Sequence, residues 1–221
     1  MAIQMSSAHP GRRKPKAPDA NRSEILAAAA EEFSSRGFKG ASMDAIAART
    51  CTTRALINYY FASKEGLYLA VLEGAYAEIR DAERLLELDH LPPTDAIRRI
   101  VEFTFNYYVD HEDFVRLVVA ENQARGQHLR KFTSMRAVNR PIIDTLSAVL
   151  ARGQAEGAFR GDVDAVDVHM AIAALGMFNV TNQYTFGAIF QRAMGAKGDM
   201  ARRRRLVVEM VLRWLKPELD G

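Results

Sequence analysis

The sequence predicts an all-α protein, with an N-terminal three-helix helix-turn-helix domain, a larger C-terminal helical domain and about nine helices in total. Three observations lead to this prediction. Apolar residues recur at the i, i+3 and i+4 spacing of amphipathic helices along most of the chain. No segment alternates apolar and polar residues as a half-buried strand does. Of the 221 residues, 48% are hydrophobic, which is enough to form a core in one or two domains.

Three short helices are expected within residues 21–68. The first begins after the capping residue Asn21, ends at Gly37, and has an apolar face formed by Ile25, Leu26, Ala29 and Phe33. Ser42 opens the second helix, whose inner face is formed by Met43, Ile46 and Ala47. A tight turn at 50–52 then leads into a third helix over 53–61. Two short helices joined by such a turn form a helix-turn-helix.

Longer helices are expected over residues 69–221, which we assign to a helical domain for ligand binding and dimerisation. Ser63 caps a long helix over 64–88, and the Pro92-Pro93 pair separates it from the next. The further helices are predicted around 97–108 and 114–121, and over 135–156, 166–180 and 200–215. Asp162 or Asp164 is expected to cap the helix over 166–180.

Charge is distributed unevenly along the chain. Residues 1–64 carry ten Lys or Arg and five Asp or Glu, whereas 65–221 carry twenty and twenty-two. A basic N-terminal part on a near-neutral body suits contact with DNA, although a solvated basic tail would give the same balance. Residues 1–20 contain three prolines and a basic run, so we expect a disordered basic arm. This arm either contacts DNA or only aids solubility.

Several classes of protein are excluded by composition. No stretch reaches 18 apolar residues and no signal peptide is evident, so we expect a cytoplasmic protein with no membrane contact. Cys51 is the only cysteine, and the five histidines lie on separate segments without metal-ligand spacing. No phosphate-binding loop or catalytic motif occurs. We therefore expect no enzyme activity, no cofactor and no metal.

The helix over 53–61 carries the chemistry of base recognition on one side. Placed at 100° per residue, its outer half is formed by Arg54, Ala55, Asn58 and Tyr59. An arginine can bond guanine through two hydrogen bonds, and an asparagine can bond adenine in the same way. Ser42, Thr53 and Tyr59 can donate to phosphates, and Lys64 lies at a helix start that favours an anion. These residues predict binding to double-stranded DNA.

The stretch from Ala41 to Leu67 resembles the DNA-binding domain of TetR/AcrR-type regulators. Its most specific part is Asn58-Tyr59-Tyr60-Phe61, followed by Ser63-Lys64-Glu65. The resemblance implies a homodimer, a palindromic operator and repression relieved by a small ligand. It also implies DNA contacts at Ser42, Thr53, Arg54, Asn58, Tyr59 and Lys64. The alternative is a DNA-binding protein of the same fold that responds to a protein partner or organises the chromosome.

The turn before the third helix departs from the pattern of this family. Its turn commonly has glycine and then an aliphatic residue, where this chain has Cys51 and Thr52. If the turn requires a positive φ, Cys51 adopts it at some cost in strain. We expect Cys51 to be a small buried residue rather than a redox switch, which would need exposure and a lowered pKa.

A pocket for a small, largely apolar or aromatic ligand is a further expectation for the C-terminal domain. Its candidate residues are Phe103, Tyr107, Glu121, Asn122, Phe178 and Asn182. The aromatic residues could equally be plain core. Glu121 lies on an apolar helix face and must therefore be paired. We favour an internal arginine such as Arg125 or Arg140 as its partner over a ligand.

The last two predicted helices are too apolar for a solvated surface. Small residues on the first would allow a close helix approach, and the second has a broad apolar stripe. We therefore expect a four-helix interface with the same helices of a second chain. Candidate interface residues are Ala171, Ala174, Leu206, Met210 and Trp214.

Overall fold

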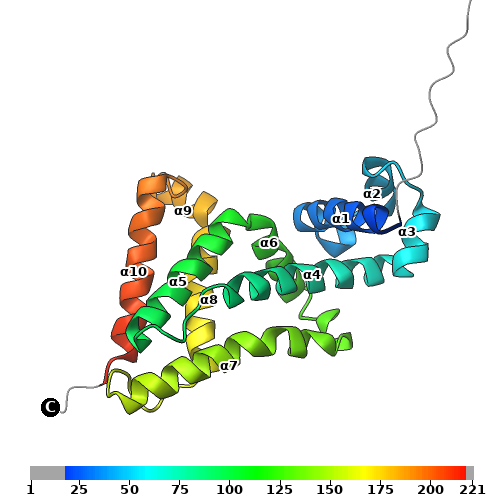
Figure 1. Cartoon of the computed structure of the whole chain (residues 1–221). Coiled ribbons are helices and arrows are strands. Elements are labelled where there is room, and N and C mark those ends of the chain that lie inside the picture. Colours follow the sequence, from blue (N-terminus) through cyan, green and yellow to red (C-terminus); the bar gives the residue numbers. More distant parts are fainter. Residues whose placement is uncertain (1–17, 218–221) are drawn as a thin grey trace, which may run out of the picture.

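The computed structural model describes residues 18–217, and all the regular secondary structure in that range is helical. The first three helices form a small head, with α1 at Pro18–Gly40, α2 at Met43–Arg49 and α3 at Arg54–Phe61. The long helix α4, Lys64–Arg84, runs from this head into a larger body (Figure 1). The all-α prediction and its division into two parts are confirmed.

The body is built from α5 onward. Its elements are α5 (Pro93–Asp110), α6 (Glu112–Gln123), the 3-10 turn η1 (Leu129–Lys131), α7 (Ser134–Ala155), α8 (Ala165–Thr181), α9 (Gln183–Phe190) and α10 (Lys197–Leu215). Helix α7 lies alongside α4, while α5, α8 and α10 pack together at the end of the molecule away from the head (Figure 1). In residues 18–217, no helix is long and apolar enough to cross a membrane.

Several boundaries differ from the sequence prediction. Helix α1 begins at Pro18, so 18–20 belong to the helix and not to the expected arm, while 1–17 lie outside the described residues. Gly37 interrupts α1 with a φ of 64°, which agrees with the expected end there. Helix α4 ends at Arg84 rather than at 88, because a turn follows in which Glu87 has a positive φ.

The expected total of about nine helices omitted α9. This helix has only eight residues, contains Gly187 and lacks a side-chain cap at its start. None of its residues is buried, so its sequence shows no core-facing stripe. Such a segment is indistinguishable from a connecting loop by apolar periodicity alone.

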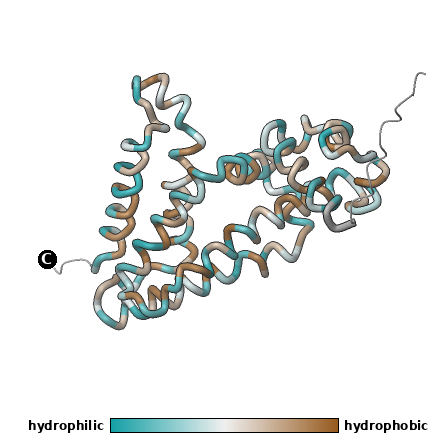
Figure 2. The backbone as a smooth tube through the Cα atoms, turned by 45° about the horizontal axis from the view of Figure 1, so that its top comes forward, coloured by the Kyte–Doolittle hydropathy of each residue, from teal (hydrophilic) through white to brown (hydrophobic). Residues whose placement is uncertain are grey.

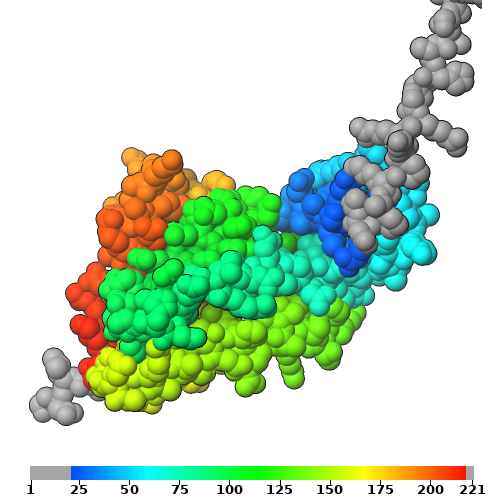
Figure 3. Space-filling view, viewed as in Figure 1, coloured from blue at the N-terminus to red at the C-terminus, as the bar shows by residue number. Residues whose placement is uncertain are grey.

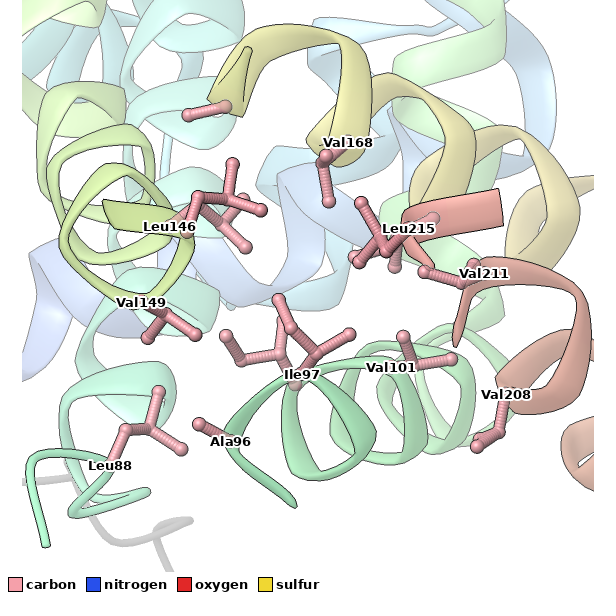
Figure 4. Close-up of a cluster of buried hydrophobic side chains, with 14 of the residues drawn as sticks. Leu88, Ala96, Ile97, Val101, Leu146, Val149, Val168, Val208, Val211 and Leu215 are labelled. Carbon is pink, nitrogen blue, oxygen red and sulfur yellow. The ribbon is translucent and has the colours of Figure 1, made fainter. Parts of the chain in front are cut away.

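The core of the body lies where α5, α7, α8 and α10 meet. Ile97, Val101, Leu146, Val168 and Leu215 are fully buried there and point toward one another (Figure 4). Burial of each such side chain contributes about 1.5 to 3 kcal/mol. Along the helices of the body, apolar positions alternate with polar ones (Figure 2), as expected for helices with one face on a shared core.

The core of the head includes one helix of the body. Ile25, Phe33, Ile46 and Ile57 are fully buried in it, and Leu117 of α6 packs into the same cluster. Helix α1 contacts both α4 and α6. The position of the head is therefore set by the body through α6, and not by the α4 connection alone.

Candidate nucleic-acid interface

Two side-chain caps define where the two helices of the helix-turn-helix begin. The Ser42 hydroxyl accepts a hydrogen bond from the backbone N–H of Ala45 at 3.3 Å, at the start of α2. The Thr53 hydroxyl accepts one from the N–H of Leu56 at 3.2 Å, at the start of α3. Both residues are extended, as N-caps require, so Thr53 precedes α3 and is not its first residue.

The turn between α2 and α3 is held by backbone hydrogen bonds. The N–H of Thr52 donates to the carbonyl of Ala47 at 3.0 Å, which closes the end of α2 onto the turn. Cys51 has a positive φ of 51° in this turn, as expected at a position where the family commonly has glycine. The expectation of a buried Cys51 is wrong, because this residue lies in the turn between α2 and α3 and is exposed.

The two sides of α3 have opposite environments. Ile57 and Phe61 are buried against the head, and Leu56 and Tyr60 are half-buried. Arg54, Ala55, Asn58 and Tyr59 are all exposed, Tyr59 with 82% of its surface accessible. This division agrees with the sequence prediction. Helix α3, in cyan, lies at the outer edge of the head, at the opposite end of the molecule from α10 (Figure 3).

The guanidinium of Arg54 is exposed and available for contact with a nucleic acid. Its nearest charged partner is Asp44 of α2, with 3.8 Å between Nη1 and Oδ2 and with both side chains largely exposed. An exposed pair at that distance contributes about 1 kcal/mol or less, so it orients Arg54 without competing strongly with a nucleic acid. Asn58 lies one helical turn further along α3, on the same exposed side.

Lys64 has a structural role that sequence reasoning did not foresee. Its Nζ donates to the carbonyl oxygens of Ala41 at 2.6 Å and Lys39 at 3.4 Å, and it lies 5.1 Å from the centre of the Phe38 ring. These contacts tie the start of α4 to the last residues of α1 and to Ala41. A phosphate contact by Lys64 remains a prediction, in which the third ammonium proton would be the donor.

A buried carboxylate organises the head and was also missed. Glu32 of α1 accepts the backbone N–H of Ser42 at 3.1 Å and pairs with Arg36 and Arg49 at 3.3 and 3.4 Å. It thereby fixes α1 against α2. The signal was present in the sequence, because Glu32 follows Ile25 and Ala29 at helical spacing on the apolar face.

The candidate ligand residues do not converge on one pocket. Phe178 and Asn182 line a cavity between α8, α9 and α10. Tyr107 is buried against Phe114 and stacks on His111, with Phe103 beside it. Asn122 is exposed and donates only to the carbonyl of Val118, while Glu121 is in a separate site.

Glu121 is paired with a histidine, so the expected arginine partner is wrong. The Glu121 side chain is 2% exposed, and its Oε2 accepts from Nδ1 of His128 at 2.8 Å. Its Oε1 accepts the backbone N–H groups of His128 and Leu129 at 2.9 and 3.1 Å. The His128 ring packs on Phe38 of the head and on Tyr68 of α4, with 4.3 and 5.0 Å between ring centres. The pair therefore lies at the junction between head and body.

A second buried pair lies inside the body. Arg80 and Glu83 of α4 are 3.1 Å apart and both buried. Burial raises the pKa of Glu83 to about 7, although Arg80 acts in the opposite direction. Burial, with a smaller contribution from Arg80, lowers the pKa of His169 on α8 to about 4. Among residues 18–217, no three His, Cys, Asp or Glu side chains cluster as a metal site requires.

Comparison with known proteins supports the two-part division. Residues 25–71 match the model of bacterial regulatory proteins of the tetR family, and residues 93–211 match the tetracyclin repressor-like C-terminal domain. The chain belongs to the TetR family. It is therefore a DNA-binding transcriptional regulator, which agrees with the expectation that it is not an enzyme.

Relatives and solved structures extend this membership over most of the chain. The transcriptional repressor NicS of Pseudomonas putida is 34% identical over 198 residues, which cover 90% of this chain and 93% of NicS. The solved structure of the putative transcriptional regulator SCO4942 from Streptomyces coelicolor is 25% identical, with a TM-score of 0.66, covering 89% of this chain and 99% of that one. A TetR-family protein from Rhodococcus RHA1 shares the fold, with a TM-score of 0.71 at 18% identity, covering 89% and 97% of the two chains.

Proposed function

We propose that this TetR-family protein is a repressor that binds a palindromic operator as a homodimer, and that a small, largely apolar or aromatic ligand releases it from DNA. The observation that carries the DNA-binding part is the exposed side of α3. Arg54 and Asn58 combine two base-reading side chains with Ala55, which lets the helix approach the groove closely. Repression is supported by the 34% identical relative NicS, which is a transcriptional repressor.

The dimer part is supported by an apolar stripe on α8. Val166, Met170, Ala174 and Phe178 follow one another at four-residue spacing and are all exposed. Met210 of α10 adds a further exposed apolar side chain. Of the other predicted interface residues, Ala171, Leu206 and Trp214 are half-buried, and Trp214 packs partly on the core of its own chain. An exposed apolar stripe of this length is typical of a helix that packs on a partner.

A pair of substitutions tests the dimer. Met170→Glu places a charge in the middle of the stripe, whereas Leu85→Glu places one at an exposed apolar residue outside it. We expect the wild type and Leu85→Glu to have a dimer mass by sedimentation at micromolar concentration, and Met170→Glu to have a monomer mass. A monomeric wild type would contradict the dimer.

The mechanism of release is a shift between two states of the dimer. Two copies of α3 must be separated by about 34 to 36 Å to enter successive major grooves. The ligand binds more tightly to a state in which the two copies of α3 have a different separation. It thereby lowers the affinity for DNA, by a factor set by the ratio of its own affinities for the two states. Helix α4 connects each head to its body, and α6 sets the angle of the head by its contact with α1.

Footprinting on the region upstream of the protein's own gene tests the function as a whole. We expect protection of a two-fold symmetric site with half-sites about one helical turn, or a multiple of it, apart. Protection without symmetry, or a genome-wide map of many dispersed sites, would contradict an operator-specific repressor and favour the chromosome-organising alternative.

A further inference from the structure

A cavity of about 310 Å³ lies between α8, α9 and α10. Three phenylalanines form its apolar wall. Phe178 meets Phe186 edge-on at 5.3 Å, and Phe186 meets Phe190 at 5.1 Å, measured between ring centres. The volume is at the small end of the range of ligand pockets, and an aromatic wall favours a flat apolar group. The helices that line it lie at the end of the body where α9 leads into α10 (Figure 1).

The remaining wall of this cavity is cationic. Arg192, Arg202 and Arg203 line it, and among residues 18–217 no carboxylate does so. Asp199 pairs with Arg202 at 2.9 Å and so balances one of the three charges. Arginine binds carboxylate groups through parallel hydrogen bonds, so this wall is suited to a planar anion.

Two polar side chains of the cavity have atoms without a partner. Asn179 is 1% exposed, and its Nδ2 donates to the sulfur of Met200 at 3.0 Å. Its Oδ1 is buried and accepts no hydrogen bond within the described residues, and Nε of Arg203 likewise has no acceptor there. A buried polar atom without a partner destabilises the protein, so a ligand group that forms a hydrogen bond with it would bind favourably.

From the phenylalanine wall, the arginine charge and these unpartnered atoms, we propose that the cavity binds a small organic anion with an aromatic body. The ring of the ligand lies against the three phenylalanines. Its carboxylate pairs with Arg203 and Arg192, and a hydroxyl or N–H group of the ligand can donate to Oδ1 of Asn179.

Hydrogen bonds and a ring contact connect the cavity to the head. Gln183, at the start of α9, donates to Glu112 at the start of α6 at 2.9 Å. The other end of α6 carries Glu121, whose partner His128 packs on Phe38 of the head. A ligand that moves α9 therefore acts on the helix that positions the head. This regulatory consequence rests on the proposed function, whereas binding in the cavity does not.

Binding is tested by calorimetry on the full-length protein with benzoate, 2-naphthoate and the two corresponding neutral carboxamides. We expect at least one carboxylate to bind with one site per chain, about tenfold more tightly than its carboxamide, because a charge-assisted hydrogen bond is lost in the amide. Absence of saturable binding by both carboxylates would overturn the proposal, as would equal affinity for acids and amides. Absence of binding is the result expected if a second copy of the chain fills the cavity.

Matched variants locate the site. Arg203→Gln should reduce the preference for the acid to less than about threefold, while Arg203→Lys should retain part of it because the charge remains. Arg205→Gln alters an exposed arginine two residues away that does not line this cavity, and should change nothing. On α9, Phe186→Ser should abolish binding and the exposed Tyr184→Ser should not. Unchanged binding in both Arg203→Gln and Phe186→Ser would place the ligand elsewhere and refute the assignment.

A separate assay distinguishes the site from its regulatory role. Operator affinity is measured by fluorescence anisotropy with and without the carboxylate that binds. Binding that leaves operator affinity unchanged would overturn the effector role while leaving the site in place. Failure of the wild type to bind any operator would refute the proposed function itself, and the calorimetric result would still decide the cavity.

Discussion

Replacement of Glu121 tests whether the buried pair with His128 holds the head on the body. The Glu121 carboxylate accepts three hydrogen bonds, from the N–H groups of His128 and Leu129 and from the His128 ring. Glu121→Ala leaves at least two of these donors buried without an acceptor, at about 1 to 3 kcal/mol each. The substitution also removes the cost of burying the Glu121 carboxylate away from water, and this offsets part of the loss. We expect a net loss of about 3 kcal/mol in the free energy of unfolding.

Urea denaturation at fixed protein concentration measures this loss, because association makes the midpoint concentration-dependent. The thermal midpoint should fall by about 6 to 12 °C for a chain of this size. Asn122→Ala is the matched control, since Asn122 is exposed on the same helix and bonds only the carbonyl of Val118. It should change stability by less than about 0.5 kcal/mol. An equally small effect of Glu121→Ala would refute the role of the pair.

Three further predictions follow from local geometry or burial. Gly66→Ala places a Cβ 2.1 Å from the carbonyl oxygen of Phe61, so it should displace α3 and lower both the thermal midpoint and operator affinity; full affinity would contradict this. Cys51→Gly should raise stability by about 1 kcal/mol, since the φ of 51° then carries no strain, whereas Cys51→Val should lower it. The unfolding free energy should change little between pH 4.5 and 6.5, because two shifted groups oppose each other. The raised pKa of Glu83 makes the unfolding free energy fall as the pH rises from 4.5 to about 7. The lowered pKa of His169 makes the unfolding free energy rise as the pH rises from about 4 to 6.5. Each effect is at most about 3 kcal/mol. In Glu83→Gln the unfolding free energy should rise with pH over this range, and in His169→Gln it should fall with pH. Identical pH profiles for the two variants would refute this assignment.

The parts of the fold that the sequence predicted well are those with local causes. Ser42, Ser63 and Asp164 each accept a backbone N–H two or three residues further on, so each cap depends only on its own segment. The exposed and buried sides of α3 follow from helical periodicity in the same way.

The parts that were missed depend on contacts between segments. Glu121 was correctly expected to be paired, but its partner follows the turn after α6, where a positive φ at Arg125 and Gly126 brings His128 back. Lys64 bonds carbonyls more than twenty residues earlier in the chain. Periodicity assigns a side chain to a face and cannot say which face of another helix it meets.

The candidate ligand residues show the same limit. Phe178 and Asn182 line one cavity because α9, which periodicity does not reveal, folds back beside α8. Tyr107 and Glu121 lie on α5 and α6 and are used in the core and at the junction with the head. Aromatic and carboxylate residues on apolar faces could be assigned to pairing or packing, but only the tertiary arrangement separates these roles.

The central claim, that the exposed side of α3 reads the operator, is tested most directly by Arg54→Ala and Asn58→Ala. Affinity is measured by anisotropy for the operator and for a set of single-base substitutions, with Arg98→Ala, an exposed arginine of the body, as control. Each variant should lose about 1 to 3 kcal/mol of discrimination at one base pair of each half-site, while Arg98→Ala binds as the wild type does. Unchanged base preference in both variants would contradict the account.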